Sequence, residues 1–167
     1  MRLETARLVI RSFDPSMDFG PYYSIVADAN VMKYLGGVLS KEQAVQYIDR
    51  AIETERTSGY ARYAVIHKER DELVGMCGFA PVRDYIDLGY RFAKCVWGRG
   101  LATEAASAVV AYGFAEHGFR EIVALTHPEN SASISVLEKL GFSYQHDETT
   151  PMGTPARRYV GTKASTT

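Results

Sequence analysis

A segment with two glycines, residues 95–105 (CVWGRGLATEA), joins an apolar run to a helix-like sequence. Glycine places no side chain between a ligand and the backbone and adopts positive φ readily, so Gly98 and Gly100 predict a turn open to close approach. A helix starting directly after Gly100 would add unpaired amides and the positive end of its dipole. The segment therefore predicts an anion site, although the same glycines also suit an ordinary strand-to-helix connection.

The size and charge of the chain restrict where such a site can lie. Its 167 residues predict a single domain, 1–167, and contents of 46% hydrophobic and 23% charged residues are typical of a soluble globular protein. Nineteen basic and twenty acidic side chains give a net charge of -1. We expect neither nucleic acid nor an anionic membrane as a partner, so an anion site must be local.

The cysteines, the histidines and the N-terminal segment bear on metals and location. Cys77 and Cys95 form neither a disulfide framework nor a metal-binding spacing, and the four histidines are scattered along the chain. The N-terminal residues form no apolar signal segment, and no apolar run reaches membrane-spanning length. We expect no metal site, no membrane insertion and a cytoplasmic location.

Apolar periodicity and turn residues predict alternating strands and helices. The expected strands are Leu8–Ile10, Tyr60–His67, Leu73–Phe79, Ile86–Phe92, Ile122–Thr126, Phe142–His146 and Arg157–Gly161. The expected helical segments are 16–37, ending at Gly36-Gly37 with a possible break at Gly20-Pro21; Ser40–Arg56; 101–117; and Ser131–Leu140. This order indicates an α+β protein, with a mixed central sheet flanked by helices.

Two well-known phosphate loops do not match the glycine turn. The P-loop ending Gly-Lys-Ser/Thr is absent, which argues against nucleotide hydrolysis. The dinucleotide fingerprint requires Gly or Ala where Thr103 stands, and Glu121 lies at the start of the next strand, not near its carboxyl end. A nicotinamide-dependent oxidoreductase is therefore only an alternative.

Two separated segments resemble the acetyl-CoA core of the GNAT-type N-acetyltransferase superfamily. They are DLGYRFAKCVWGRGLATEAASAVVAYGF and VALTHPENSASISVLEKLGF. Residues 97–102 occupy the positions of the family's pyrophosphate loop, with Trp97 in place of its usual Gln or Arg. Trp-Gly-x-Gly with Ala-Thr-Glu-Ala, and Asn-x-x-Ser with Glu-Lys-Leu-Gly-Phe, are similar to the branch of ribosomal-protein N-terminal-alanine acetyltransferases.

The resemblance implies a mostly antiparallel sheet and a cosubstrate site between the strands ending near Phe92 and Thr126. It implies that the backbone of Phe92 and the side chain of Asn130 contact pantetheine, and that the Ser133 hydroxyl supports the leaving sulfur. Leu137 stands where many members of the superfamily carry a tyrosine acid. The amides implied to bind the pyrophosphate of acetyl-CoA are those of Gly98, Arg99, Gly100, Ala102 and Thr103.

The residues leave several roles open. Asp87 is the acid nearest the cofactor strand and is the candidate base, with Glu148 and Glu104 as alternatives. Ser133 could equally be a helix cap. Tyr60, Tyr63, Tyr85 and Tyr90 could line an acceptor pocket or simply pack on strands.

The function expected from this resemblance is transfer of acetyl from acetyl-CoA to a primary amine by direct attack. The acceptor could be a peptide N-terminus or a small molecule, because acceptor pockets differ within such folds. A noncatalytic acyl-CoA sensor is the other alternative. Monomer and homodimer both remain open.

Overall fold

The computed structural model describes residues 1–150 and 152–165. Its strands form one eight-stranded sheet in the order β1-β2-β3-β4-β5-β6-β8-β7. All neighbouring strands are antiparallel except β5 and β6. The strands are β1 (Arg2–Glu4), β2 (Leu8–Arg11), β3 (Arg62–His67), β4 (Glu72–Val82), β5 (Tyr85–Phe92), β6 (Glu121–Thr126), β7 (Ser143–Thr149) and β8 (Pro155–Thr162).

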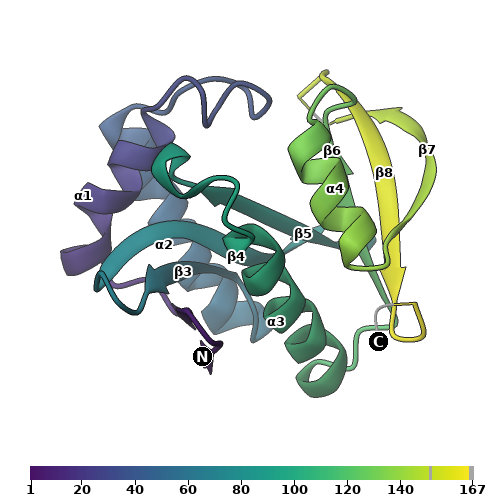
Figure 1. Ribbon diagram of the computed structural model, residues 1–167, viewed down its shortest axis with the longest axis horizontal. Helices are drawn as coiled ribbons and strands as arrows, with labels where there is room; N and C mark the ends of the chain where they lie inside the picture. The colour runs from purple at the N-terminus through teal and green to yellow at the C-terminus, as the bar shows by residue number, and fades with distance from the viewer. Residues whose placement is uncertain (151, 166–167) are drawn as a thin grey trace.

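Helices cover both faces of this sheet (Figure 1). They are α1 (Pro15–Val26), α2 (Lys41–Ser58), α3 (Leu101–Glu116) and α4 (Ser131–Lys139), with a 3-10 turn at Lys94–Val96. Helices α1 and α2 pack on one face and α3 and α4 on the other, so two apolar clusters form. Along β3 the side chains alternate between them, because Tyr63 and Val65 join the α3 cluster while Ala64 and Ile66 join the α1 cluster.

The first helix is shorter than the sequence indicates. It ends at Val26, well before Gly36-Gly37, so the predicted helix over 16–37 is wrong in its second half. The side chain of Asp28 accepts from the backbone amide of Asn30 at 2.8 Å, an Asx turn that competes with continued helix. Pro21 does not break the helix but lies within it. Strand β1 was not expected.

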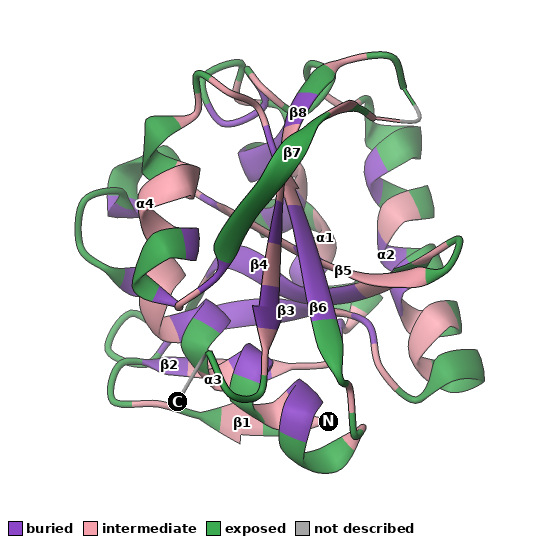
Figure 2. Ribbon diagram, turned by 90° about the vertical axis from the view of Figure 1, so that its right-hand side faces the viewer, coloured by how far each residue is buried: buried purple, intermediate pink, exposed green. Residues whose placement is uncertain are grey.

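Strands β5 and β6 separate along their length. They are parallel neighbours, and their only registered pair among the described residues is Asp87 with Val123. From there the two strands diverge toward their carboxyl ends, Phe92 and Thr126 (Figure 1). On its other side β6 pairs with β8, and β8 pairs with the largely exposed edge strand β7 (Figure 2). The backbone edge of β5 is therefore left without a strand partner near Phe92.

Candidate active site

The glycine turn presents a row of free amides. Gly98 and Gly100 both have positive φ, 73° and 74°, and Gly100 is the N-cap of α3 without a capping side chain. In the described chain no acceptor receives a hydrogen bond from the amides of residues 98–103. A Cβ at Gly98 would meet open space. This is the geometry that binds an anion at a helix N-terminus.

Arg7 and Glu104 hold this turn in place. Arg7 donates from Nη1 to the Arg99 carbonyl at 2.8 Å and from Nε to Glu104 Oε2 at 2.7 Å. Thr5 donates to the other carboxylate oxygen of Glu104 at 2.5 Å. Burial alone would raise the pKa of Glu104, but the hydrogen bonds from Thr5 and Arg7 outweigh it and lower that pKa. Glu104 therefore fastens the turn to the β1–β2 loop, a contact the sequence did not suggest.

The edge of β5 next to this turn is partly capped by Trp97. Ala93 donates to Val74 of β4 at 2.8 Å. Successive strand residues direct their backbone groups to opposite sides, so the amide and carbonyl of Phe92 face away from β4. The indole of Trp97 donates to the Phe92 carbonyl at 2.9 Å, while the Phe92 side chain is buried in the core. The Phe92 amide remains on the open edge.

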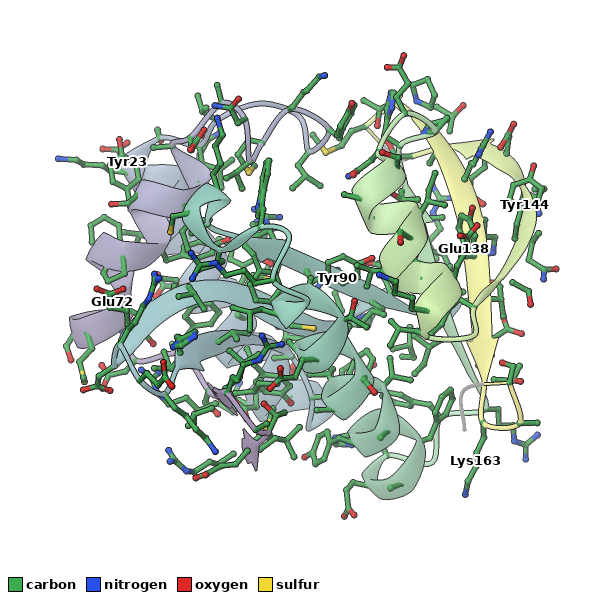
Figure 3. The ribbon with its side chains drawn as sticks, in the orientation of Figure 1. Tyr23, Glu72, Tyr90, Glu138, Tyr144 and Lys163 are labelled. Atoms are coloured by element: carbon green, nitrogen blue, oxygen red, sulfur yellow. The ribbon has the colours of Figure 1, made fainter. Side chains whose placement is uncertain are left out.

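Helix α4 brings Ser133 toward the same edge. Asn130 is the N-cap, and its Oδ1 accepts from the Ser133 amide at 3.2 Å. The Ser133 hydroxyl is therefore not the cap; instead it lies 3.0 Å from the hydroxyl of Tyr90 on β5. Figure 3 places Tyr90 between β5 and α4. Leu137, at the position of the missing tyrosine, is buried in the core.

Tyr90 is the residue of this site that the sequence did not single out. It was only one of several tyrosines on strands, and no local pattern relates it to a serine 43 positions later. Burial raises the pKa of Tyr90, and the hydrogen bond with Ser133 only partly offsets this. Its phenol is therefore neutral and able to donate at any ordinary assay pH.

The candidate bases lie apart from Ser133. Asp87 projects from the opposite face of β5 to Tyr90, since three positions separate them, and it forms a buried ion pair with Arg62. Burial raises the pKa of Asp87, against the lowering effect of Arg62. Glu148 on β7 contacts His146 at 3.2 Å and Arg158 at 3.5 Å.

The described residues, 1–150 and 152–165, bear on a metal site and on a membrane span. Among them, no three His, Cys, Asp or Glu side chains are gathered as a metal site would require. None of the helices they form is both long enough and apolar enough to cross a bilayer.

Comparisons with known proteins agree with this geometry. A family model described as "Acetyltransferase (GNAT) domain" matches residues 7–143. The chain is 32% identical over 144 residues to a protein of Bacillus subtilis (strain 168) described as the uncharacterized N-acetyltransferase YnaD, covering 84% of this chain and 82% of that one. These matches define an acetyltransferase. The chain belongs to the GNAT acetyltransferase family.

Solved structures share the same fold. A GNAT-family acetyltransferase from Bacillus anthracis superposes with a TM-score of 0.86 at 27% identity, covering 98% of this chain and 99% of that one. A ribosomal-protein-S5-alanine acetyltransferase from Vibrio fischeri superposes with a TM-score of 0.83 at 14% identity, covering 100% and 99%. At that identity the second likeness concerns the fold, which is the α+β fold with a mixed sheet expected from the sequence.

Proposed function

We propose that residues 1–167 act as one N-acetyltransferase domain that moves acetyl from acetyl-CoA to a primary amine within a ternary complex. The observation that carries this proposal is the row of unpaired amides at 98–103 beside the unpartnered edge of β5. Backbone amides at a helix N-terminus bind a diphosphate without requiring a basic protein surface. This agrees with the net charge of -1.

The same arrangement supports a site for each part of the cosubstrate. The pyrophosphate is assigned to the amides of Gly98, Arg99, Gly100, Ala102 and Thr103. The amide of Phe92 on the open edge of β5 is assigned to pantetheine. The side chain of Asn130 is also assigned to pantetheine. Its Oδ1 accepts the hydrogen bond of the helix cap, while its Nδ2 donates to no acceptor in the described residues and is free to donate to the ligand.

The chemistry requires a neutral amine, a polarised thioester carbonyl and support for the leaving sulfur. The amine nitrogen attacks the carbonyl carbon, a C–N bond forms, the C–S bond breaks, and the sulfur takes the electron pair. The Ser133 hydroxyl is assigned to the leaving thiolate, with Tyr90 as its positioning residue. Asp87 is assigned to the amine proton through water, a role for which its raised pKa is suitable.

The acceptor is a peptide N-terminus or a small amine. The Vibrio fischeri neighbour is described as a ribosomal-protein-S5-alanine acetyltransferase, and this supports retaining a peptide N-terminus as one candidate acceptor. A noncatalytic acyl-CoA sensor would have the same free amides, and it is distinguished by transferring no acetyl to any amine. A nicotinamide-dependent oxidoreductase is distinguished by binding NADH and not acetyl-CoA.

Calorimetric titration with acetyl-CoA, with NADH as the comparison ligand, tests the proposal. Saturable binding of acetyl-CoA alone is expected, followed by thiol release when an amine panel is added. Binding without thiol release for every amine would favour the sensor. Binding of NADH but not acetyl-CoA would overturn the proposal.

A further inference from the structure

The face of β5 opposite Tyr90 carries an arginine without an acidic partner. Arg91 contacts Tyr22 of α1 through Nη1 at 3.4 Å and Met32 Sδ at 3.7 Å, and its guanidinium lies 5.1 Å from the centre of the Tyr47 ring on α2. Its Nε is shielded from solvent and has no hydrogen-bond partner in the described chain. All three neighbours are uncharged: burial raises the pKa of Tyr22, so that phenol is not an anion at neutral pH.

The nearby carboxylate is already in use. Arg62 of β3 crosses Gly89, where a Cβ would lie 1.3 Å from its Nη1, and it pairs with Asp87. The side chains of Arg62 and Asp87 are only 16% and 18% exposed, so this pair is charge-balanced inside the protein. Asp87 is therefore not available to Arg91 as a charge partner.

Two carboxylates of the surrounding elements are also engaged elsewhere. Asp18 of α1 pairs with Arg11 at 2.7 Å, and Glu55 of α2 pairs with the N-terminal ammonium at 3.2 Å. Arg91 forms no ion pair with any carboxylate of the described residues. A partly buried guanidinium without an anion is costly, and a carboxylate is the group whose geometry it matches best.

Arg91 lies next to the site of transfer but on its other face. It directly precedes Phe92, whose amide is on the open edge of β5, and its side chain is directed away from the Tyr90–Ser133 pair. A hollow of about 430 Å³ lies near this end of the strand, lined by Ile25, Val31 and Ala93 together with the charged side chains of Asp28 and Lys94. Ile25 and Val31 belong to the α1–α2 cluster, while Ala93 packs against both clusters, so the hollow offers space for a small molecule at the edge of this face.

We propose that the acetyl acceptor is an amine that also carries a carboxylate, and that Arg91 binds this carboxylate while the amine faces the thioester. The inference rests on the proposed acetyl transfer. It specifies an anionic small amine, such as a free amino acid, over a neutral or cationic amine.

The test compares amino acids with their carboxamides, which keep the amine and replace the anion. The wild-type protein should favour the acid about tenfold or more in kcat/KM, the scale of one charge-assisted hydrogen bond. In Arg91→Met this ratio should fall to about one, with the Kd for acetyl-CoA unchanged, and Arg91→Lys should keep part of it. Arg50→Met, on the exposed surface of α2, is the matched control.

Wild-type protein that uses acid and amide equally would overturn the inference, as would a preference that survives in Arg91→Met. If Arg91→Met does not fold, the inference is decided by the acid-to-amide ratio of kcat/KM in the wild-type protein and by how much of that ratio Arg91→Lys keeps. Failure of the acetyltransferase proposal gives a different result, because thiol release is then absent with both members of every pair.

Discussion

The hydroxyl of Tyr90 lies 3.0 Å from Oγ and 3.2 Å from the backbone oxygen of Ser133, so one phenol ties β5 to the first turn of α4. These two elements flank the place where β5 and β6 separate. A neutral phenol has one proton to donate, and both Oγ and the backbone oxygen of Ser133 are within its reach. When the phenol donates to Oγ, the serine proton is free to point at a third group. This contact can therefore orient the serine toward a leaving sulfur.

Replacing Tyr90 by Phe removes only the hydroxyl. We expect kcat to fall several-fold or more while KM for acetyl-CoA changes little, and the free energy of unfolding to fall by about 1 kcal/mol. Steady-state kinetics and urea denaturation measure the two effects. Tyr144→Phe is the control, because within the described chain the Tyr144 hydroxyl hydrogen-bonds only to the exposed Asp147 on β7. A merely structural Tyr90 would show the stability loss with normal kcat.

Ser133→Ala and Asn130→Ala separate catalysis from helix capping. Ser133→Ala should lower kcat about 10- to 100-fold, the value of a hydrogen bond to a developing charge. It should cost less stability than Tyr90→Phe, because Tyr90 can still donate to the Ser133 carbonyl. Asn130→Ala removes the observed cap and should cost about 1 kcal/mol of unfolding free energy. Both are measured by kinetics and thermal denaturation. Equal losses of stability in the two variants would contradict these assignments.

Gly100→Asp tests the anion site. Its carboxylate would stand among the amides assigned to the pyrophosphate, so acetyl-CoA binding should fall by about 100-fold or more. Calorimetry of the folded variant measures the change. Gly118→Asp is a matched control, because Gly118 also has positive φ, 62°, with open space around it, at the far end of α3. Equal affinities for acetyl-CoA in the two variants would argue against the site.

The Glu104 carboxylate should make stability depend on pH. Its pKa is lowered in the folded protein, so its contribution is complete above the unfolded value of about 4.3 and is lost as the pH falls through the folded value. Glu104→Gln should reduce the unfolding free energy by about 1 kcal/mol at pH 7 and flatten its decline from pH about 5 to about 3.

Denaturant titrations across that pH range provide the measurement for Glu104. Glu69→Gln, in the exposed turn between β3 and β4, serves as the control and should leave the wild-type curve in place. If Glu104→Gln declined with pH as steeply as the wild-type protein, the Arg7–Glu104 contact would not be the source of the dependence.

Asp87→Asn separates the ion pair from a role as base. It leaves Arg62 without its charge partner and should cost about 3 kcal/mol of unfolding free energy. The double variant Arg62→Met/Asp87→Asn should recover most of this loss, because the unpaired charge is gone. If Asp87 accepts the amine proton, kcat stays low in the double variant. The fall in rate on the acid side of the pH–rate profile, whose midpoint in the wild-type protein should lie above the usual Asp pKa, then disappears.

The glycine turn shows how much of the site could be predicted from the sequence. Positive φ at Gly98 and Gly100, the start of α3 at Leu101, and the asparagine N-cap all depend on residues within a few positions. Such features follow local steric and hydrogen-bonding rules. The end of α1 was missed because a helical apolar pattern continues past Asp28, where the chain turns instead.

Local rules therefore account for most of the element types and for the open amides of this protein, and the order of the elements indicates the mixed sheet. Only tertiary packing brings Tyr90 into contact with Ser133 and Arg7 into contact with Glu104. Packing also leaves Arg91 without an acidic partner. Each joins or separates groups from different elements, and whether a charge finds a partner depends on every element around it. The divergence of β5 and β6 creates the site, because it leaves backbone and side chains of distant segments facing one unpaired strand edge.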